Sequence, residues 1–66
     1  MGAIYDLRVA IEKKIKADGL DEAKVRGQIG LRAGKLLGLI TPSTPDDPAT
    51  IAKIKLAAKE FLHADL

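Results

Sequence analysis

Four glycines close together constrain the fold of this chain more than any other feature. They lie between Gly27 and Ile40, at positions 27, 30, 34 and 38. A single helix through all four would be destabilised by about 3–4 kcal/mol, since each helical glycine costs roughly 0.8–1 kcal/mol relative to alanine. That is a large share of the stability of a small domain. We therefore predict that the helix breaks at Gly30, where apolar residues lie on both sides.

Helical signals flank this stretch on both sides. Apolar residues recur at helical spacing from Ile4 onward, and Gly19 can close that helix in the left-handed conformation. Asp21 is a suitable N-cap for a second helix. Asp47 followed by Pro48 predicts the start of a last helix. The sequence thus predicts an all-α fold, a compact bundle of four short helices near 4–18, 22–29, 32–40 and 48–62.

The expected core is aliphatic, because aromatic residues make up only 3% of the chain. With 66 residues, a single small helical domain over 1–66 is the expected organisation. The chain has no cysteine, so neither a disulfide nor a thiolate metal site can stabilise it. The side chains predicted to form the core are Ile4, Leu7, Ile11, Ile15, Val25, Ile29, Leu36, Leu39, Ile51, Ile54, Ala58 and Phe61.

Several functions find no support in the sequence. The only histidine, His63, lies near the end of the chain, and Asp46 and Asp47 are explained as turn and cap residues. The glycines do not follow a phosphate-binding pattern. No apolar run approaches the ~20 residues needed to span a membrane, and no signal-peptide pattern is present. We expect no enzyme activity, cofactor, metal, small-molecule substrate or membrane partner, and a cytoplasmic location.

The same central stretch is basic, which suggests a nucleic-acid partner. No acidic residue occurs from Ala23 to Pro45, although the net charge of the whole chain is only +2. If the helix breaks at Gly30, the following helix over 32–40 presents basic side chains that can enter a major groove. Arg32 and Lys35 are expected to contact phosphates. The residues predicted to bind nucleic acid are Arg26, Gln28, Arg32, Lys35 and Thr41.

A family resemblance points the same way. The run V-R-G-Q-I-G-L-R-A-G-K-L-L-G-L over 25–39 resembles the helix–turn–helix of phage-repressor-like DNA-binding domains, the lambda repressor and Cro family. The helices expected over 4–18 and 48–62 are similar to the flanking helices of such domains. The resemblance implies a helix–turn–helix-like central pair, binding to duplex DNA and a role in transcription regulation.

A second hypothesis stays open beside this one. Glycines at helical spacing let two helices approach closely, and exposed apolar residues mark contact surfaces. In this interpretation the segment 27–40 is a protein-interaction or dimerisation module, whose partner is a second copy or another protein. The interface residues that it predicts are Gly34, Leu37, Gly38 and Ile40, with Leu37 and Ile40 exposed.

Overall fold

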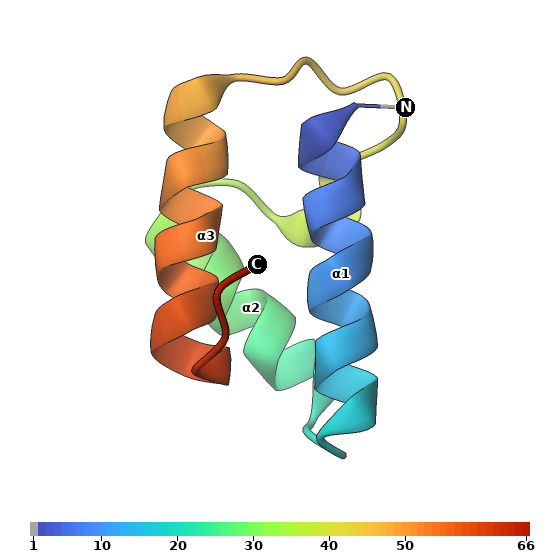
Figure 1. Cartoon of the computed structure of the whole chain (residues 1–66), viewed down its shortest axis with the longest axis vertical. Helices are drawn as coiled ribbons and strands as arrows, with labels where there is room; N and C mark the ends of the chain where they lie inside the picture. The colour runs from blue at the N-terminus through green and yellow to red at the C-terminus, as the bar shows by residue number, and fades with distance from the viewer. Residues whose placement is uncertain (1) are drawn as a thin grey trace.

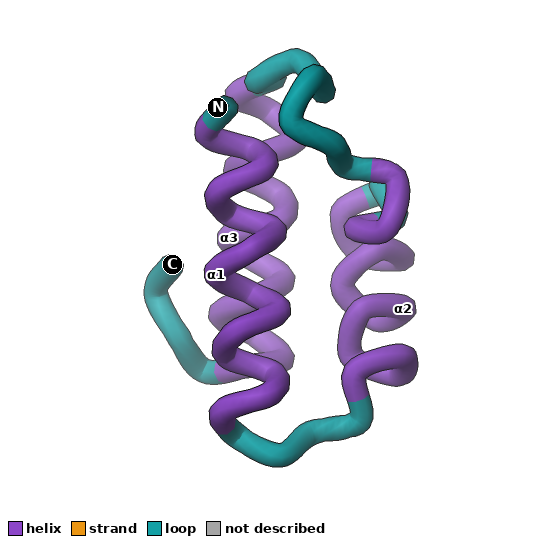
Figure 2. Tube along the Cα trace, turned by 90° about the vertical axis from the view of Figure 1, so that its right-hand side faces the viewer, coloured by secondary structure: helices purple, strands orange, loops and turns teal. Residues whose placement is uncertain are grey.

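The computed structural model describes residues 2–66, and within them it contains helices and loops but no strand. Its elements are α1 (Ala3–Ala17), α2 (Glu22–Ala33), the short 3₁₀ segment η1 (Leu37–Leu39) and α3 (Pro48–Leu62). α1 and α3 stand side by side, and α2 packs across one side of this pair (Figures 1 and 2). The all-α prediction is confirmed, whereas the four helices are not, because residues 2–66 form three α-helices.

α1 forms where the apolar periodicity predicts it. Gly19, at φ +64°, closes its C-terminal end, and the Leu20 N–H reaches back to the carbonyl of Ile15. This is the left-handed ending that glycine permits at low steric cost. One face of α1 contributes four aliphatic side chains to the core, as predicted, namely Ile4, Leu7, Ile11 and Ile15.

α3 also begins at the predicted place. Asp47 is its N-cap residue and Pro48 opens the first turn. The Asp47 carboxylate accepts a hydrogen bond from the Thr50 hydroxyl at 2.6 Å, which lowers the pKa of Asp47. The helix buries Ile54, Ala57, Ala58 and Leu62, while Ile51 and Phe61 pack against the core partly buried.

The predicted break at Gly30 is wrong. α2 continues through Gly30 to Ala33 and ends at Gly34, whose φ is +69°. Gly30 has another role, because a Cβ atom there would lie 3.0 Å from Leu36 Cδ2 and 3.3 Å from Leu36 Cα. The missing side chain therefore allows the chain after the helix to fold back onto α2.

The helix predicted over 32–40 is also wrong, and the side chains after Gly34 face the opposite way from the prediction. Leu37 and Ile40 are 1% and 0% exposed, whereas Leu36 and Leu39 are 56% and 63% exposed. The reason lies in the backbone, because Leu36 and Ile40 are extended and helical spacing no longer applies to them. Leu36 and Leu39 are thus not core residues, and Leu37 and Ile40 are not exposed interface residues.

Two polar contacts hold the loop after η1 against α1. The Arg8 guanidinium donates a hydrogen bond from Nη1 to the carbonyl oxygen of Ile40. The Asp46 carboxylate accepts the backbone N–H of Ile4 at 2.9 Å, and this bond lowers the pKa of Asp46. Gly2, the N-cap of α1, has no side chain that could accept a hydrogen bond from the free backbone N–H groups of the first turn. Asp46, at the far end of the loop, supplies that acceptor.

Candidate interaction surface

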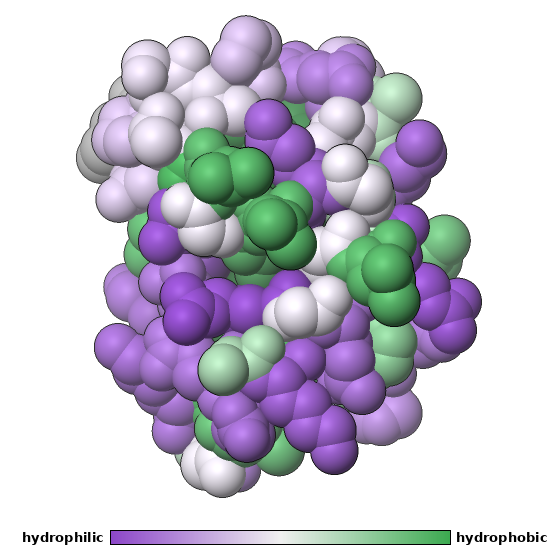
Figure 3. Space-filling model, turned by 180° about the vertical axis from the view of Figure 1, so that it is seen from behind, coloured by the Kyte–Doolittle hydropathy of each residue, from purple (hydrophilic) through white to green (hydrophobic). Residues whose placement is uncertain are grey.

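Three exposed leucines lie close together in sequence on α2 and the segment that follows it. Leu31, Leu36 and Leu39 are 85%, 56% and 63% exposed, and we name them the leucine surface. Figure 3 shows the side of the molecule on which α2 lies, where hydrophobic atoms form separate groups with near-neutral and hydrophilic atoms between them. Single exposed leucines are common, whereas larger exposed apolar patches are typical of contact sites.

A shallow groove runs beside the leucine surface, between α2 and η1. Two glycines line it, Gly27 and Gly38, and at neither would an added Cβ meet a heavy atom within 4 Å. Neither has a positive φ angle. Nothing within residues 2–66 therefore requires glycine at these positions, although Gly27 costs α2 about 1 kcal/mol relative to alanine. The residues that line the groove are Ala23, Arg26, Gly27, Leu36, Leu37 and Gly38.

The two arginines of α2 form ion pairs with other helices. Arg32 Nη2 lies 2.9 Å from Glu60 Oε1, and its guanidinium stands 5.7 Å from the centre of the Phe61 ring. Arg26 Nη1 lies 3.8 Å from Glu12 Oε1, a longer and weaker contact. Arg32 is thus held by α3, while Arg26 is held only loosely by α1.

The lysines of this region have no such partners. Across residues 2–66, no carboxylate lies within ion-pair distance of Lys24 or Lys35. Lys24 is exposed on α2, and Lys35 is half-buried just after the helix ends. Lys35 lines a separate hollow together with Ile4, Thr44, Pro45, Asp47 and Thr50, so Arg26 is the one charged residue among residues 2–66 that lines the groove.

The residues predicted to bind nucleic acid do not lie on a pair of helices around Gly30. Arg26, Gln28 and Arg32 all belong to α2, whereas Lys35 follows the helix and Thr41 follows η1. Arg26, Gln28 and Lys35 are half-buried, and Arg32 and Thr41 are exposed. The structure therefore removes the arrangement from which DNA binding was expected, and the role of each residue stays a prediction.

Of the predicted interface residues, Gly34 and Gly38 are exposed, and Gly38 lines the groove. Sequence reasoning missed the leucine surface because it assumed helical spacing beyond Gly34. One signal was available for Leu31, which lies four residues after Gly27 and so on the same face of a continuous helix.

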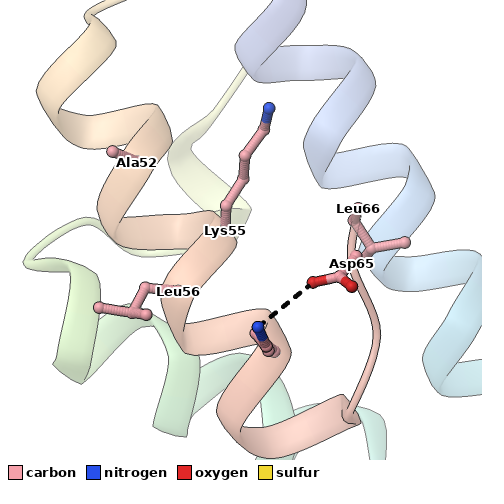
Figure 4. Close-up of a pocket in the computed structure, with 6 residues that line it drawn as sticks. Ala52, Lys55, Leu56, Asp65 and Leu66 are labelled. Atoms are coloured by element: carbon pink, nitrogen blue, oxygen red, sulfur yellow. Dashed lines mark ion pairs between the residues drawn. The ribbon is translucent and has the colours of Figure 1, made fainter.

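A second groove lies between α3 and the tail that follows it (Figure 4). The chain turns at His63, whose φ is +54°. It contains the exposed Leu56 and an ion pair of 3.8 Å between Lys59 and Asp65. Both ends of that pair are strongly exposed, so it contributes little to holding the tail in place.

Within residues 2–66, no three histidine, aspartate or glutamate side chains gather as metal ligands would. The helices of the same residues lack the length and apolar character needed to cross a membrane. Comparison with protein-family models, curated proteins and solved structures finds no match to this chain. Its function is therefore argued from its own surface.

Proposed function

We propose that this chain is a protein-interaction module that binds a helical segment of another protein on the leucine surface. The observation that carries the proposal is the side-chain orientation after Gly34. Leu37 and Ile40 fill the core, so the side chains of Leu36 and Leu39 are left largely in solvent. An amphipathic helix in an apolar groove is a recurrent mode of protein recognition.

The groove beside the leucine surface suits such a segment. Gly27 of α2 and Gly38 of η1 offer bare backbone to the groove, and Leu36 lines it as an apolar contact. Small residues allow a second backbone to approach closely, which increases the van der Waals contact per residue. The dimerisation expected as an alternative used Gly34, Leu37, Gly38 and Ile40, and of the two exposed members Gly38 lines this groove.

Duplex DNA binding is the competing proposal. It now depends on cations spread over α2 and the turn after it, rather than on a separate helix over 32–40. Glu60 already pairs with Arg32, so a phosphate must compete with a carboxylate for that side chain. Lys35 has no such competitor among the described residues.

The test is a titration of isotope-labelled protein with a synthetic helical peptide that has a leucine stripe and glutamine flanks. We expect amide shift changes at the leucine surface, and their loss in the double variant Leu36→Ser with Leu39→Ser. The matched control is Leu56→Ser, a leucine of α3 with 69% exposure, which should leave binding unchanged. Binding that survives the double variant, or no binding, contradicts the proposal.

The competing proposal is tested on the same samples by titration with duplex DNA at two salt concentrations. Salt-dependent binding that is lost in the double variant Arg32→Ala with Lys35→Ala would establish DNA binding in its place. Circular dichroism of each variant checks that the helices are intact.

A further inference from the structure

We infer that residues 63–66, which we name the tail, are a two-state cover for one side of the molecule. In the structure the tail folds back against α3. In the second state it continues α3 as a helix and leaves that side open. The inference does not rest on the function proposed above, because the tail and α2 lie on opposite sides of the pair formed by α1 and α3 (Figure 2).

The tail covers the side of the helix pair that faces away from α2. It lies over the space between α1 and α3 on that side (Figures 1 and 2). Ala64 and Leu66 pack against the core there and are partly buried. Within residues 2–66, the tail is thus the segment that shields this part of the core from solvent.

The folded-back state depends on the backbone of His63. Its φ of 54° and ψ of 37° lie in the left-handed region, and among residues 2–66 it is the one residue other than glycine with a positive φ. This conformation is unfavourable for a residue with a Cβ atom. Gly19 and Gly34 adopt it after α1 and α2 without that cost. His63 therefore gives α3 a less favourable ending than glycine gives the other two helices.

Few contacts hold the tail in the folded-back state. The His63 N–H donates to the carbonyl of Lys59 at 2.9 Å, but this bond has helical spacing and would persist in a continued helix. The exposed ion pair of Lys59 with Asp65 contributes little. The partial burial of Leu66 and Ala64 remains as the favourable contact. In the tail, a modest apolar contact thus offsets an unfavourable backbone conformation.

The sequence of the tail is compatible with the helical state. Alanine and leucine are among the best helix formers, and no glycine or proline occurs from Ala49 to Leu66. In a continued helix, Leu66 would lie about 21 Å along the axis from Ala52, at a rise of about 1.5 Å per residue. In the structure the two residues line the same groove (Figure 4). The two states therefore exclude each other, and the groove exists only when the tail is folded back.

Two substitutions of the exposed His63 test the inference in opposite directions. Glycine accepts the left-handed conformation and is a poor helix former, whereas alanine has the opposite preferences. Cα chemical shifts of residues 63–66 measure the helical state, and nuclear Overhauser contacts of the Leu66 methyl groups with the core measure the folded-back state. We expect the ratio of folded-back to helical tail to be about thirtyfold higher in His63→Gly than in His63→Ala. The unsubstituted protein should lie between them.

A second pair of variants tests the contact that holds the tail. Leu66→Ser weakens the apolar contact and leaves the residue at position 63 unchanged, so it should shift the tail toward the helical state. The matched control is Leu39→Ser, an exposed leucine of η1, which should leave the tail unchanged. Circular dichroism of each variant checks that the three helices persist.

The measurements distinguish a two-state tail from the alternatives. Helical shifts with loss of the Leu66 contacts in His63→Ala, and the reverse in His63→Gly, support the inference. Shifts that are the same in the unsubstituted protein and in both variants overturn it, because the tail then has a single state. A tail that leaves the core in His63→Ala without helical shifts also overturns it, because the released state is then disordered.

Discussion

α1 and the segment from Leu31 to Ile40 use similar residues to opposite effect. Each isoleucine and leucine of α1 is buried, whereas the segment buries Leu37 and Ile40 and exposes its other three leucines. α1 is one regular helix, so a single periodicity fixes which side chains face the core. The segment leaves the helix at Gly34, and each later side chain is oriented by its own backbone angles. The exposure of Leu36 and Leu39 is thus a product of the turn, whereas Leu31 is exposed on α2 itself.

The largest effect is expected from a pair of leucine truncations within this segment. Leu37→Ala should destabilise the fold by about 2–5 kcal/mol, because it empties a filled site in the core. Leu36→Ala should change stability by about 0.5 kcal/mol or less, because its side chain is largely in solvent. Urea unfolding followed by circular dichroism measures both. Equal costs for the two variants would break the contrast between buried and exposed leucines.

A smaller effect should distinguish two glycines of the same helix. Gly27→Ala should stabilise the protein by about 1 kcal/mol, since alanine is the better helix former and the new Cβ has open space. Gly30→Ala should be less stable than Gly27→Ala by about 1–2 kcal/mol, because its Cβ would press on the backbone of Leu36. Thermal unfolding of the two variants compares them directly. An equal gain in stability at both positions would mean that Gly30 is not needed for the close approach of Leu36 to α2.

These glycines also explain what the sequence could and could not reveal. The N-cap at Asp21, whose carboxylate accepts the Lys24 N–H at 3.1 Å, is a local signal and was predicted correctly. Gly30 was misjudged because a helix break and a close packing contact both favour glycine. Only the position of Leu36, a few residues further along the chain, decides between them, and the path of the chain after Gly34 sets that position.

The candidate site shows the same limit. The sequence singled out the stretch 27–40 as the candidate site, and Gly38 within it lines the groove between α2 and η1. The leucines that face solvent were chosen wrongly, since the helical period was extended past Gly34. The pairing of Arg32 with Glu60 joins two helices and has no local sequence signal.

The smallest effect concerns the contact that joins α1 to the loop. The pKa of Asp46 is lowered in the folded state because its carboxylate accepts the Ile4 N–H. A lowered folded pKa means that the stabilisation is present above the unfolded pKa and is lost as pH falls through the folded value. Asp46→Asn should therefore reduce the loss of stability in acid, as measured by urea unfolding at neutral and acidic pH. Asp65→Asn, on the exposed tail, serves as the control, and an unchanged acid response in Asp46→Asn would contradict the assignment.

The contacts of Arg8 with Ile40 and of Asp46 with Ile4 have a further consequence for the loop between them. Proteases usually cut in exposed loops, because several residues must detach from the protein and extend into the enzyme, and exposed loops detach most easily. Here both ends of the loop are anchored to α1, so detachment requires at least one anchor to open. Limited proteolysis of this loop would therefore report local unfolding at the start of α1.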